Sequence, residues 1–169
     1  MALLEILQAP HPLLKAKAAP VDRFDDRLRR LAADMLETMY AAPGVGLAAP
    51  QVGVMERLVV ADVAEGEERR PMVLVNPEIL WRSPERATAE EGCLSLPNQF
   101  ADVTRPQAVR LKYRDEHGQE RELAADGLLA RCVQHELDHL DGVLFVDHLS
   151  ALKRNMIMRK LIKNRRARA

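Results

Sequence analysis

Residues 124–140 carry two histidines and a glutamate inside a segment whose apolar residues recur with the period of an α-helix. These apolar residues are spread around most of the helical circumference, which indicates a helix that is buried on nearly all sides. They are Leu128, Leu129, Cys132, Val133, Leu137 and Leu140. Buried polar side chains need partners. We therefore predict a fold that surrounds this helix and satisfies its histidines and its glutamate.

The polar residues of this segment form the pattern H-E-x-x-H, from His135 to His139. Residues four positions apart lie one above the other on a helix, so the two histidines can present two nitrogens to one metal ion, with Glu136 beside them. A helix with two ordinary surface histidines would give the same pattern. The apolar neighbours favour burial, however, and a metal ion would supply partners to the buried groups. A catalytic metal site takes three protein ligands and keeps one position open, so a third ligand is required.

The third ligand has to come from another part of the chain. After His139 the acidic and histidine residues lack the spacing typical of metalloproteases; they are Asp141, Asp147 and His148. Cys93 in residues 90–97 (EEGCLSLP) is the stronger candidate, and we expect Gly92 before it to allow an unusual backbone turn. Cys132, the other cysteine, is interpreted as a small buried residue. Neither cysteine lies in a C-x-x-C pattern, and two reduced thiols are expected.

The rest of the chain predicts one further helix and several strands. Residues 25–41 place apolar side chains on one helical face, and Pro43-Gly44 ends that helix. Residues 44–51 (GVGLAAPQ) are uncharged and small, and are predicted to form a loop. Strands are predicted at residues 57–62, 71–76 and 108–114, with a turn at residues 116–118. We expect an α+β fold in which mostly antiparallel sheets pack around a buried central helix, with a helix at the C-terminus.

Length and composition limit the class of protein. The chain has 169 residues, of which 47% are apolar and 30% charged, as in a globular protein of one domain. Its longest apolar runs are far shorter than the roughly 20 residues needed to span a membrane. The N-terminal residues lack the basic start of a signal peptide. We expect a cytoplasmic monomer that does not contact a membrane.

The net charge of zero conceals two oppositely charged parts. The 22 residues after Asp147 contain eight Lys and Arg and no acidic residue, which leaves the preceding body with a net charge of −8. We divide the chain into a catalytic domain, residues 1–149, and a basic amphipathic helix, residues 150–169. Its apolar face is expected to consist of Ile157, Met158, Leu161 and Ile162. The basic face is either simply solvated or binds a polyanion.

Three motifs in this order resemble those of the peptide deformylases, which remove the formyl group from the N-terminal methionine of new bacterial or organellar proteins. They are residues 44–51 (GVGLAAPQ), 91–97 (EGCLSLP) and 134–140 (QHELDHL). The resemblance extends to His11–Leu14 and Met35–Tyr40, so it spans nearly the whole body. It implies that Cys93, His135 and His139 bind the metal.

The resemblance also implies roles for residues outside the metal site. Glu136 would act as base and then as acid, while the side-chain amide of Gln51 and the backbone N–H of Leu94 would stabilise the oxyanion. Gly46 would let an extended peptide substrate pair closely with residues 44–51. The methionine side chain of the substrate would enter an apolar pocket lined by Val45, Leu128 and Cys132.

Two positions depart from the family pattern. Phe100 stands where the family often has an arginine that contacts the substrate's peptide chain, and Arg131 stands where it usually has an aliphatic residue. One hypothesis is that Arg131 replaces the missing guanidinium and contacts the substrate. The alternative is that Arg131 pairs with a nearby acidic residue.

The sequence does not determine the identity of the metal ion or the role of the C-terminal helix. A thiolate and two imidazoles suit Zn(II), Fe(II), Co(II) or Ni(II), and the resemblance implies Fe(II) in the cell. In the resembled bacterial enzymes a C-terminal helix docks on the ribosome, so residues 150–169 are expected to contact ribosomal RNA.

Two other functions remain open for the chain as a whole: a zinc endopeptidase of the H-E-x-x-H type, and a catalytically silent binding protein with a structural metal.

Overall fold

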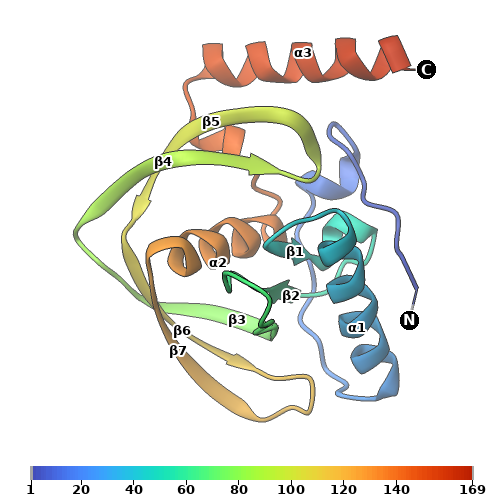
Figure 1. Ribbon diagram of the computed structural model, residues 1–169, viewed down its shortest axis with the longest axis vertical. Helices are drawn as coiled ribbons and strands as arrows, with labels where there is room; N and C mark the ends of the chain where they lie inside the picture. The colour runs from blue at the N-terminus through green and yellow to red at the C-terminus, as the bar shows by residue number, and fades with distance from the viewer. Residues whose placement is uncertain (1, 169) are drawn as a thin grey trace.

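A computed structural model describes residues 2–168 and contains two antiparallel sheets (Figure 1). The larger sheet has the strand order β1-β2-β3-β6-β7 and the smaller sheet is the hairpin β4-β5. The strands are β1 (Gly46–Ala48), β2 (Leu58–Ala61), β3 (Met72–Arg82), β4 (Arg86–Cys93), β5 (Leu96–Pro106), β6 (Ala108–Arg114) and β7 (Glu120–Asp126). The predicted α+β class is confirmed.

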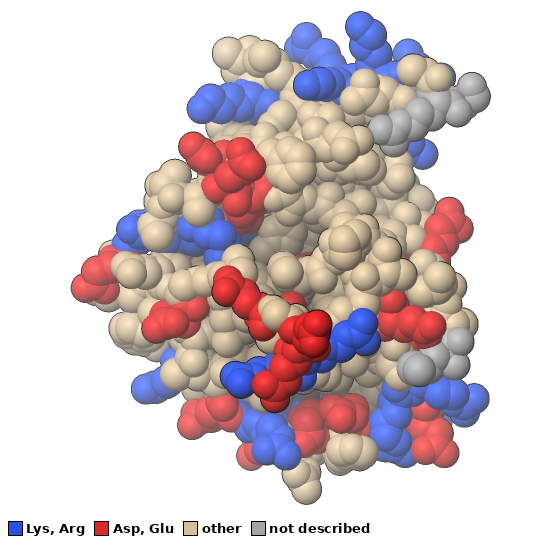
Figure 2. Space-filling model, viewed as in Figure 1, with Lys and Arg blue, Asp and Glu red and all other residues tan. Residues whose placement is uncertain are grey.

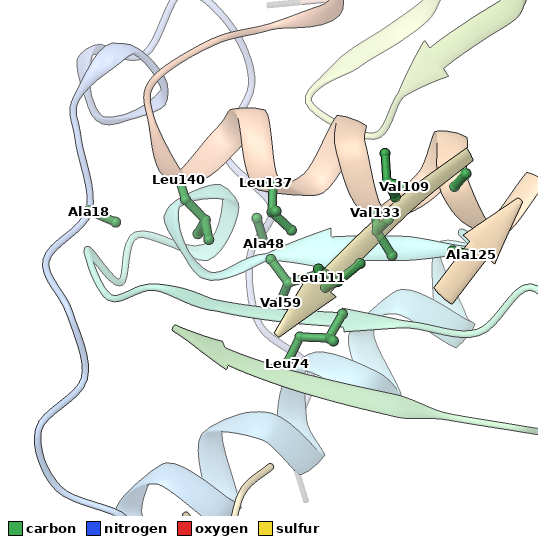
Figure 3. Packing of buried hydrophobic residues seen from close by; sticks show 11 residues of the cluster. Ala18, Ala48, Val59, Leu74, Val109, Leu111, Ala125, Val133, Leu137 and Leu140 are labelled. Atoms are coloured by element: carbon green, nitrogen blue, oxygen red, sulfur yellow. The ribbon is translucent and has the colours of Figure 1, made fainter. Parts of the chain in front are cut away.

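The helix α2 (Gly127–Leu140) lies at the centre of the molecule, between the larger sheet and the hairpin β4-β5 (Figure 1). Val133 and Leu137 point from α2 toward the side chains of Val59, Leu74 and Leu111 on the larger sheet (Figure 3). The predicted buried helix is therefore confirmed. It begins three residues later than predicted because the preceding residues belong to β7.

The helix α1 (Asp26–Ala41) covers the strands β1 and β2 through an apolar face that includes Leu28, Met35 and Met39. The Asp25 side chain accepts a hydrogen bond from the backbone N–H of Leu28 at 3.1 Å, as expected of an N-cap. Both ends of this helix agree closely with the sequence analysis. The described part also contains three short 3-10 helices: η1 (Pro12–Lys15), η2 (Ala49–Val52) and η3 (Phe145–His148).

Two parts of the fold differ from the sequence analysis. Residues 44–51 are not a simple loop, because Gly46–Ala48 pair with β2 as an edge strand and η2 follows directly. Small residues such as Gly and Ala are weak strand formers, so this pairing depends on tertiary structure. The hairpin β4-β5 was not predicted, because polar and charged residues interrupt its apolar ones and one of its faces is exposed to solvent.

The helix α3 (Ala151–Arg168) begins after Ser150, whose hydroxyl accepts a hydrogen bond from the backbone N–H of Lys153 at 3.3 Å. Leu161 is buried, and Ile157 and Met158 pack beside it against a cluster that includes Leu96, Val103 and Phe145. Apolar side chains are not confined to the docked face, since Leu152 and Met156 are exposed. Among residues 2–168, no helix is long and apolar enough to cross a membrane.

Candidate active site and metal centre

Three potential metal ligands converge where the hairpin β4-β5 meets α2. Cys93 ends β4, while His135 and His139 lie one turn apart on α2. One ligand atom from each residue lies within 4.8 Å of the other two, and Cys93 Sγ is 3.3 Å from His139 Nε2. The structure thus brings together the three residues that the sequence analysis proposed as ligands.

The chemistry of this cluster fits a divalent metal ion. One thiol and two imidazoles form the donor set that Zn(II), Fe(II) and related ions accept, and three ligands leave a position for water or substrate. Glu136 Oε1 is buried beside the cluster and has no hydrogen-bond partner within residues 2–168. A buried carboxylate without a partner is costly, and a nearby cation would stabilise it.

Burial also changes the acidity of Glu136. This carboxyl is 4% exposed, and its burial raises the pKa to about 7, although the charges of His135 and Arg105 act in the opposite direction. A carboxyl group that titrates near neutral pH can both accept and donate a proton under physiological conditions. Glu136 therefore has the acidity expected of a general base that later serves as a general acid.

Glu91 fixes the orientation of His135. The Nδ1 atom of His135 lies 2.9 Å from Glu91 Oε1, so the imidazole donates its Nδ1–H to the carboxylate and leaves Nε2 for the metal. Burial opposes ionisation of Glu91, but hydrogen bonds from His135 and Arg105 outweigh it and lower the pKa of Glu91 to about 2. The guanidinium of Arg105 forms two hydrogen bonds to this carboxylate, at 2.6 and 2.9 Å, and one to Asp138 at 2.9 Å.

The sequence analysis gave no role to Glu91, although this residue is part of the EGCLSLP motif, and it did not single out Arg105. The available signal for Glu91 was its place in the motif, two residues before Cys93. We found no local signal for Arg105, whose partners lie 14 and 33 positions away in the sequence.

Gln51, in η2, directs its side-chain amide toward Cys93. Its Oε1 accepts a hydrogen bond from the backbone N–H of Ala48 at 2.9 Å, which fixes the amide plane. Its Nε2 then donates to Ser95 Oγ at 3.0 Å and lies 3.5 Å from Cys93 Sγ. A side-chain N–H donor is thus held beside the candidate metal site.

A cavity of about 740 Å³ leads from the surface to Cys93, His135 and Glu136. All the predicted substrate-binding residues line it: Val45, Gly46, Phe100, Leu128, Arg131 and Cys132. Gln51 and Leu94 line it as well. The apolar side chains of Val45, Phe100 and Leu128 are exposed by 46%, 61% and 54%, and they gather around one cavity, as is typical of a binding site.

Gly46 and Gly92 lie where neighbouring side chains approach the backbone closely at this cavity. A Cβ atom on Gly46 would lie 2.6 Å from Glu136 Oε2, and one on Gly92 would lie 2.5 Å from the ring of Phe100. The predicted unusual turn at Gly92 is wrong, because this residue lies in β4 and the turn comes after it, at Leu94 and Ser95.

Arg131 points into the hairpin β4-β5, although part of it lines the cavity. Its Nη1 donates to Glu91 Oε2 at 2.5 Å and to the carbonyl oxygen of Val103 at 2.9 Å, and its Nη2 donates to the carbonyl oxygen of Ala87 at 2.8 Å. The geometry therefore favours the alternative in which Arg131 pairs with an acidic residue. Contact between Arg131 and the substrate stays a prediction, since this residue also lines the cavity.

Comparisons with known proteins agree with this arrangement. The model of the polypeptide deformylase family matches residues 3–155. The peptide deformylase of Phenylobacterium zucineum is 55% identical over 168 residues, which cover 99% of both chains, and that of Alkalilimnicola ehrlichii is 58% identical over 96% of this chain and 91% of the relative. The crystal structure of the Ehrlichia chaffeensis peptide deformylase in complex with actinonin superposes with a TM-score of 0.93 at 41% identity, covering 97% of this chain and 98% of that one. The chain belongs to the polypeptide deformylase family.

Proposed function

We propose that this protein hydrolyses the formyl group from the N-terminal formyl-methionine of nascent polypeptides. The observation that carries the proposal is the buried Glu136 carboxylate, whose Oε1 has no hydrogen-bond partner among residues 2–168, beside the converging Cys93, His135 and His139 at the inner end of a cavity with an apolar mouth. Membership of the deformylase family supports the same reaction. A structural metal site would need no carboxyl group with a pKa near neutral.

Cys93, His135 and His139 would hold the divalent metal. The bound ion supplies Lewis acidity, which makes hydroxide available from water at neutral pH and stabilises charge on the formyl oxygen. The donor set does not choose among Fe(II), Zn(II), Ni(II) and Co(II). We propose Fe(II) as the native ion from the family resemblance. Loss of activity in air, with retention of activity by the Zn(II) form, would support iron, because thiolates beside redox-active metals oxidise readily.

Glu136 moves the proton. Its carboxylate accepts a proton from the attacking water and then donates it to the departing amine, so the same group acts as base and as acid. Burial raises the pKa of this carboxyl, which favours the protonated form that the second step requires. Gly46 keeps the space beside Glu136 Oε2 open, because any side chain there would collide with it.

The oxyanion formed during hydrolysis would be stabilised by the Gln51 amide and by the backbone N–H of Leu94. The hydrogen bond from Ala48 to Gln51 Oε1 supports this role, because it holds the amide in place before substrate arrives. A preorganised donor costs no reorganisation during the reaction, and the loss of one such donor typically lowers the rate by roughly 10²–10³.

The substrate would bind as an extended chain against β1, which is an edge strand and can accept another strand by backbone hydrogen bonds. Its methionine side chain would occupy the apolar part of the cavity near Val45, Leu128 and Cys132. Phe100, at the cavity mouth, would contact residues that follow the methionine.

A second proposal concerns the surface of α3. Lys and Arg side chains gather along this helix (Figure 2), and those from Lys153 to Arg166 form no ion pair with another residue of the described chain. We propose that they contact ribosomal RNA, where formylated chains emerge in the cytoplasm, and that the protein acts there as a monomer. Unpaired cations attract phosphate backbones in a salt-dependent manner.

Release of formate from formyl-Met-Ala-Ser tests the proposed reaction directly. Fe(II)-loaded and Zn(II)-loaded protein are compared with the Glu136→Gln variant of each. Formate release that depends on Glu136 is expected. Cleavage of casein without formate release would instead indicate an endopeptidase, and the absence of both activities from metal-loaded protein would indicate a binding protein.

A further inference from the structure

The candidate metal site is assembled from two separate substructures. Cys93 belongs to the hairpin β4-β5, which forms its own sheet, whereas His135 and His139 belong to α2. A two-stranded hairpin has little stability by itself. Apolar residues of β5 pack against Phe145 and Leu161, outside α2. The distance between the cysteine sulfur and the imidazoles depends in addition on the contacts that join the hairpin to the helix.

Several polar contacts cross between the hairpin and α2, and most of them reach one strand only. Gln134 donates to the carbonyl oxygen of Pro106 at 3.0 Å, and Asp138 accepts from Arg105, so both contact β5. His135 contacts Glu91 on β4. Each of these contacts constrains a single strand.

Arg131 reaches both strands at once. Its guanidinium donates to Glu91 and to the carbonyl oxygen of Ala87 on β4, and to the carbonyl oxygen of Val103 on β5. Among the side-chain hydrogen bonds found in residues 2–168, no other α2 side chain contacts both strands in this way. Its side chain is 13% exposed, so water competes little for these donors.

The carboxylate that Arg131 contacts is also the one that orients His135. Glu91 therefore receives hydrogen bonds from Arg131, from Arg105 and from the Nδ1 atom of a metal ligand. Displacement of the hairpin would move this carboxylate, and the imidazole would lose its orienting partner. Such partners of metal-binding histidines typically contribute a factor of 10–100 to metal affinity.

We propose that Arg131 is a positioning residue that fixes the hairpin β4-β5 to α2, so that Cys93 and the two histidines are in place before the metal binds. A guanidinium suits this role because its planar donors reach three fixed acceptors, whereas an ammonium group acts as a point charge. The inference rests on the metal site of the proposed function, but it does not depend on which reaction that site catalyses.

The test compares Arg131→Met, Arg131→Lys and the control Arg86→Met in the full-length protein. Arg86 is an exposed arginine on the same hairpin whose side-chain hydrogen bond goes only to Thr104 O, within the hairpin. Zn(II) affinity is measured by chelator competition, the coordination of Co(II) by absorption spectroscopy, and the mobility of β4-β5 by hydrogen exchange of the metal-free protein.

Arg131→Met is expected to weaken Zn(II) binding by up to about 10-fold, the lower end of the effect of losing a direct partner of a metal-binding histidine, and to accelerate amide exchange in β4-β5 more than in β3 or β6. Arg131→Lys should recover only part of the affinity, and Arg86→Met should match the unsubstituted protein. Arg105 still pairs with Glu91 in these variants, so the fold is expected to persist. Affinity and hairpin exchange equal to those of Arg86→Met would overturn the proposal. Exchange that accelerates uniformly over the whole molecule would overturn it as well.

Metal binding is measured here without substrate. Weakened binding by Arg131→Met in a protein that releases no formate would support the positioning role and refute the proposed reaction. Unchanged Zn(II) binding by Arg131→Met in a protein that does release formate would refute the positioning role and support the proposed reaction.

Discussion

Charged residues are used in opposite ways at the metal centre and on α3. Glu91 and Arg105 are 6% and 4% exposed, and the acceptors and donors of both are paired in fixed geometry. The cations of α3 lie at the surface along one end of the molecule (Figure 2). Both regions contain several charged side chains. Those at the metal centre are buried, whereas those on α3 are in contact with water.

The comparison indicates how each region should respond to change. A buried ion loses its hydration, and only well-placed partners compensate for that loss, so the removal of one partner has a large effect. An exposed ion keeps its hydration and is screened by salt, so single substitutions have small effects and the group acts collectively.

The first prediction concerns Glu136. Glu136→Gln preserves the size of the side chain and removes its ability to transfer a proton, so turnover of formyl-methionyl peptides should fall by roughly 10²–10⁴. The three metal ligands are unchanged, and the metal content should stay the same. The measurements are kcat from formate release and the metal content of the purified protein. Turnover close to that of the unsubstituted enzyme would exclude Glu136 from proton transfer.

The second prediction compares a buried ion pair with an exposed one. Arg105→Met leaves Glu91 without the two hydrogen bonds that the Arg105 guanidinium donates, and should lower the free energy of unfolding by about 3–5 kcal/mol. Arg121→Met removes a pair with Asp115 in which the arginine is 53% exposed, and it should cost at most about 1 kcal/mol. Urea unfolding of both variants measures the difference. Equal losses would contradict the contrast between buried and exposed charge.

The buried region also shows where sequence analysis succeeds and where it fails. The helices α1 and α2 were predicted nearly residue by residue because apolar periodicity is local, and β6 has the bounds that were predicted. The polar hairpin β4-β5 was missed, because its structure comes from cross-strand pairing and from contacts with α2. No local pattern encodes such contacts.

The candidate ligands illustrate the same limit. The spacing of His135 and His139 predicted their shared face, but Cys93 lies more than 40 positions away and was selected by motif and resemblance. The direction of Arg131 could not be predicted, because Glu91, Val103 and Ala87 lie 28 to 44 positions from it. The sequence analysis left two alternatives open at this residue, and only the three-dimensional contacts separate them.

The third prediction uses pH to probe the buried carboxylate. The pKa of Glu91 is about 2 in the folded protein, below the value of 4.5 expected when it is unfolded. The ionised group therefore stabilises the fold above pH 4.5, and this stabilisation is lost as the pH falls from 4.5 toward 2. Glu91→Gln should be less stable than the unsubstituted protein at pH 7, and the difference should narrow on acidification. Urea unfolding at several pH values measures the difference in stability between the two proteins. A difference that does not change with pH would contradict the stabilising role of the ionised Glu91.

The smallest effect is expected on α3, where a single cation should matter little to the fold. Lys160 is exposed and forms no ion pair within the described chain, so Lys160→Ala should change the free energy of unfolding by less than about 0.5 kcal/mol. If the helix binds RNA, the dependence of log affinity on log salt should become less steep by about 0.7–0.9 for each cation removed. Asn155→Ala, an exposed neutral position on the same helix, is the control for both measurements. A salt dependence that is the same in both variants would show that Lys160 makes no phosphate contact. A large loss of stability would instead show that Lys160 contributes to the fold as the buried charges of the metal centre do.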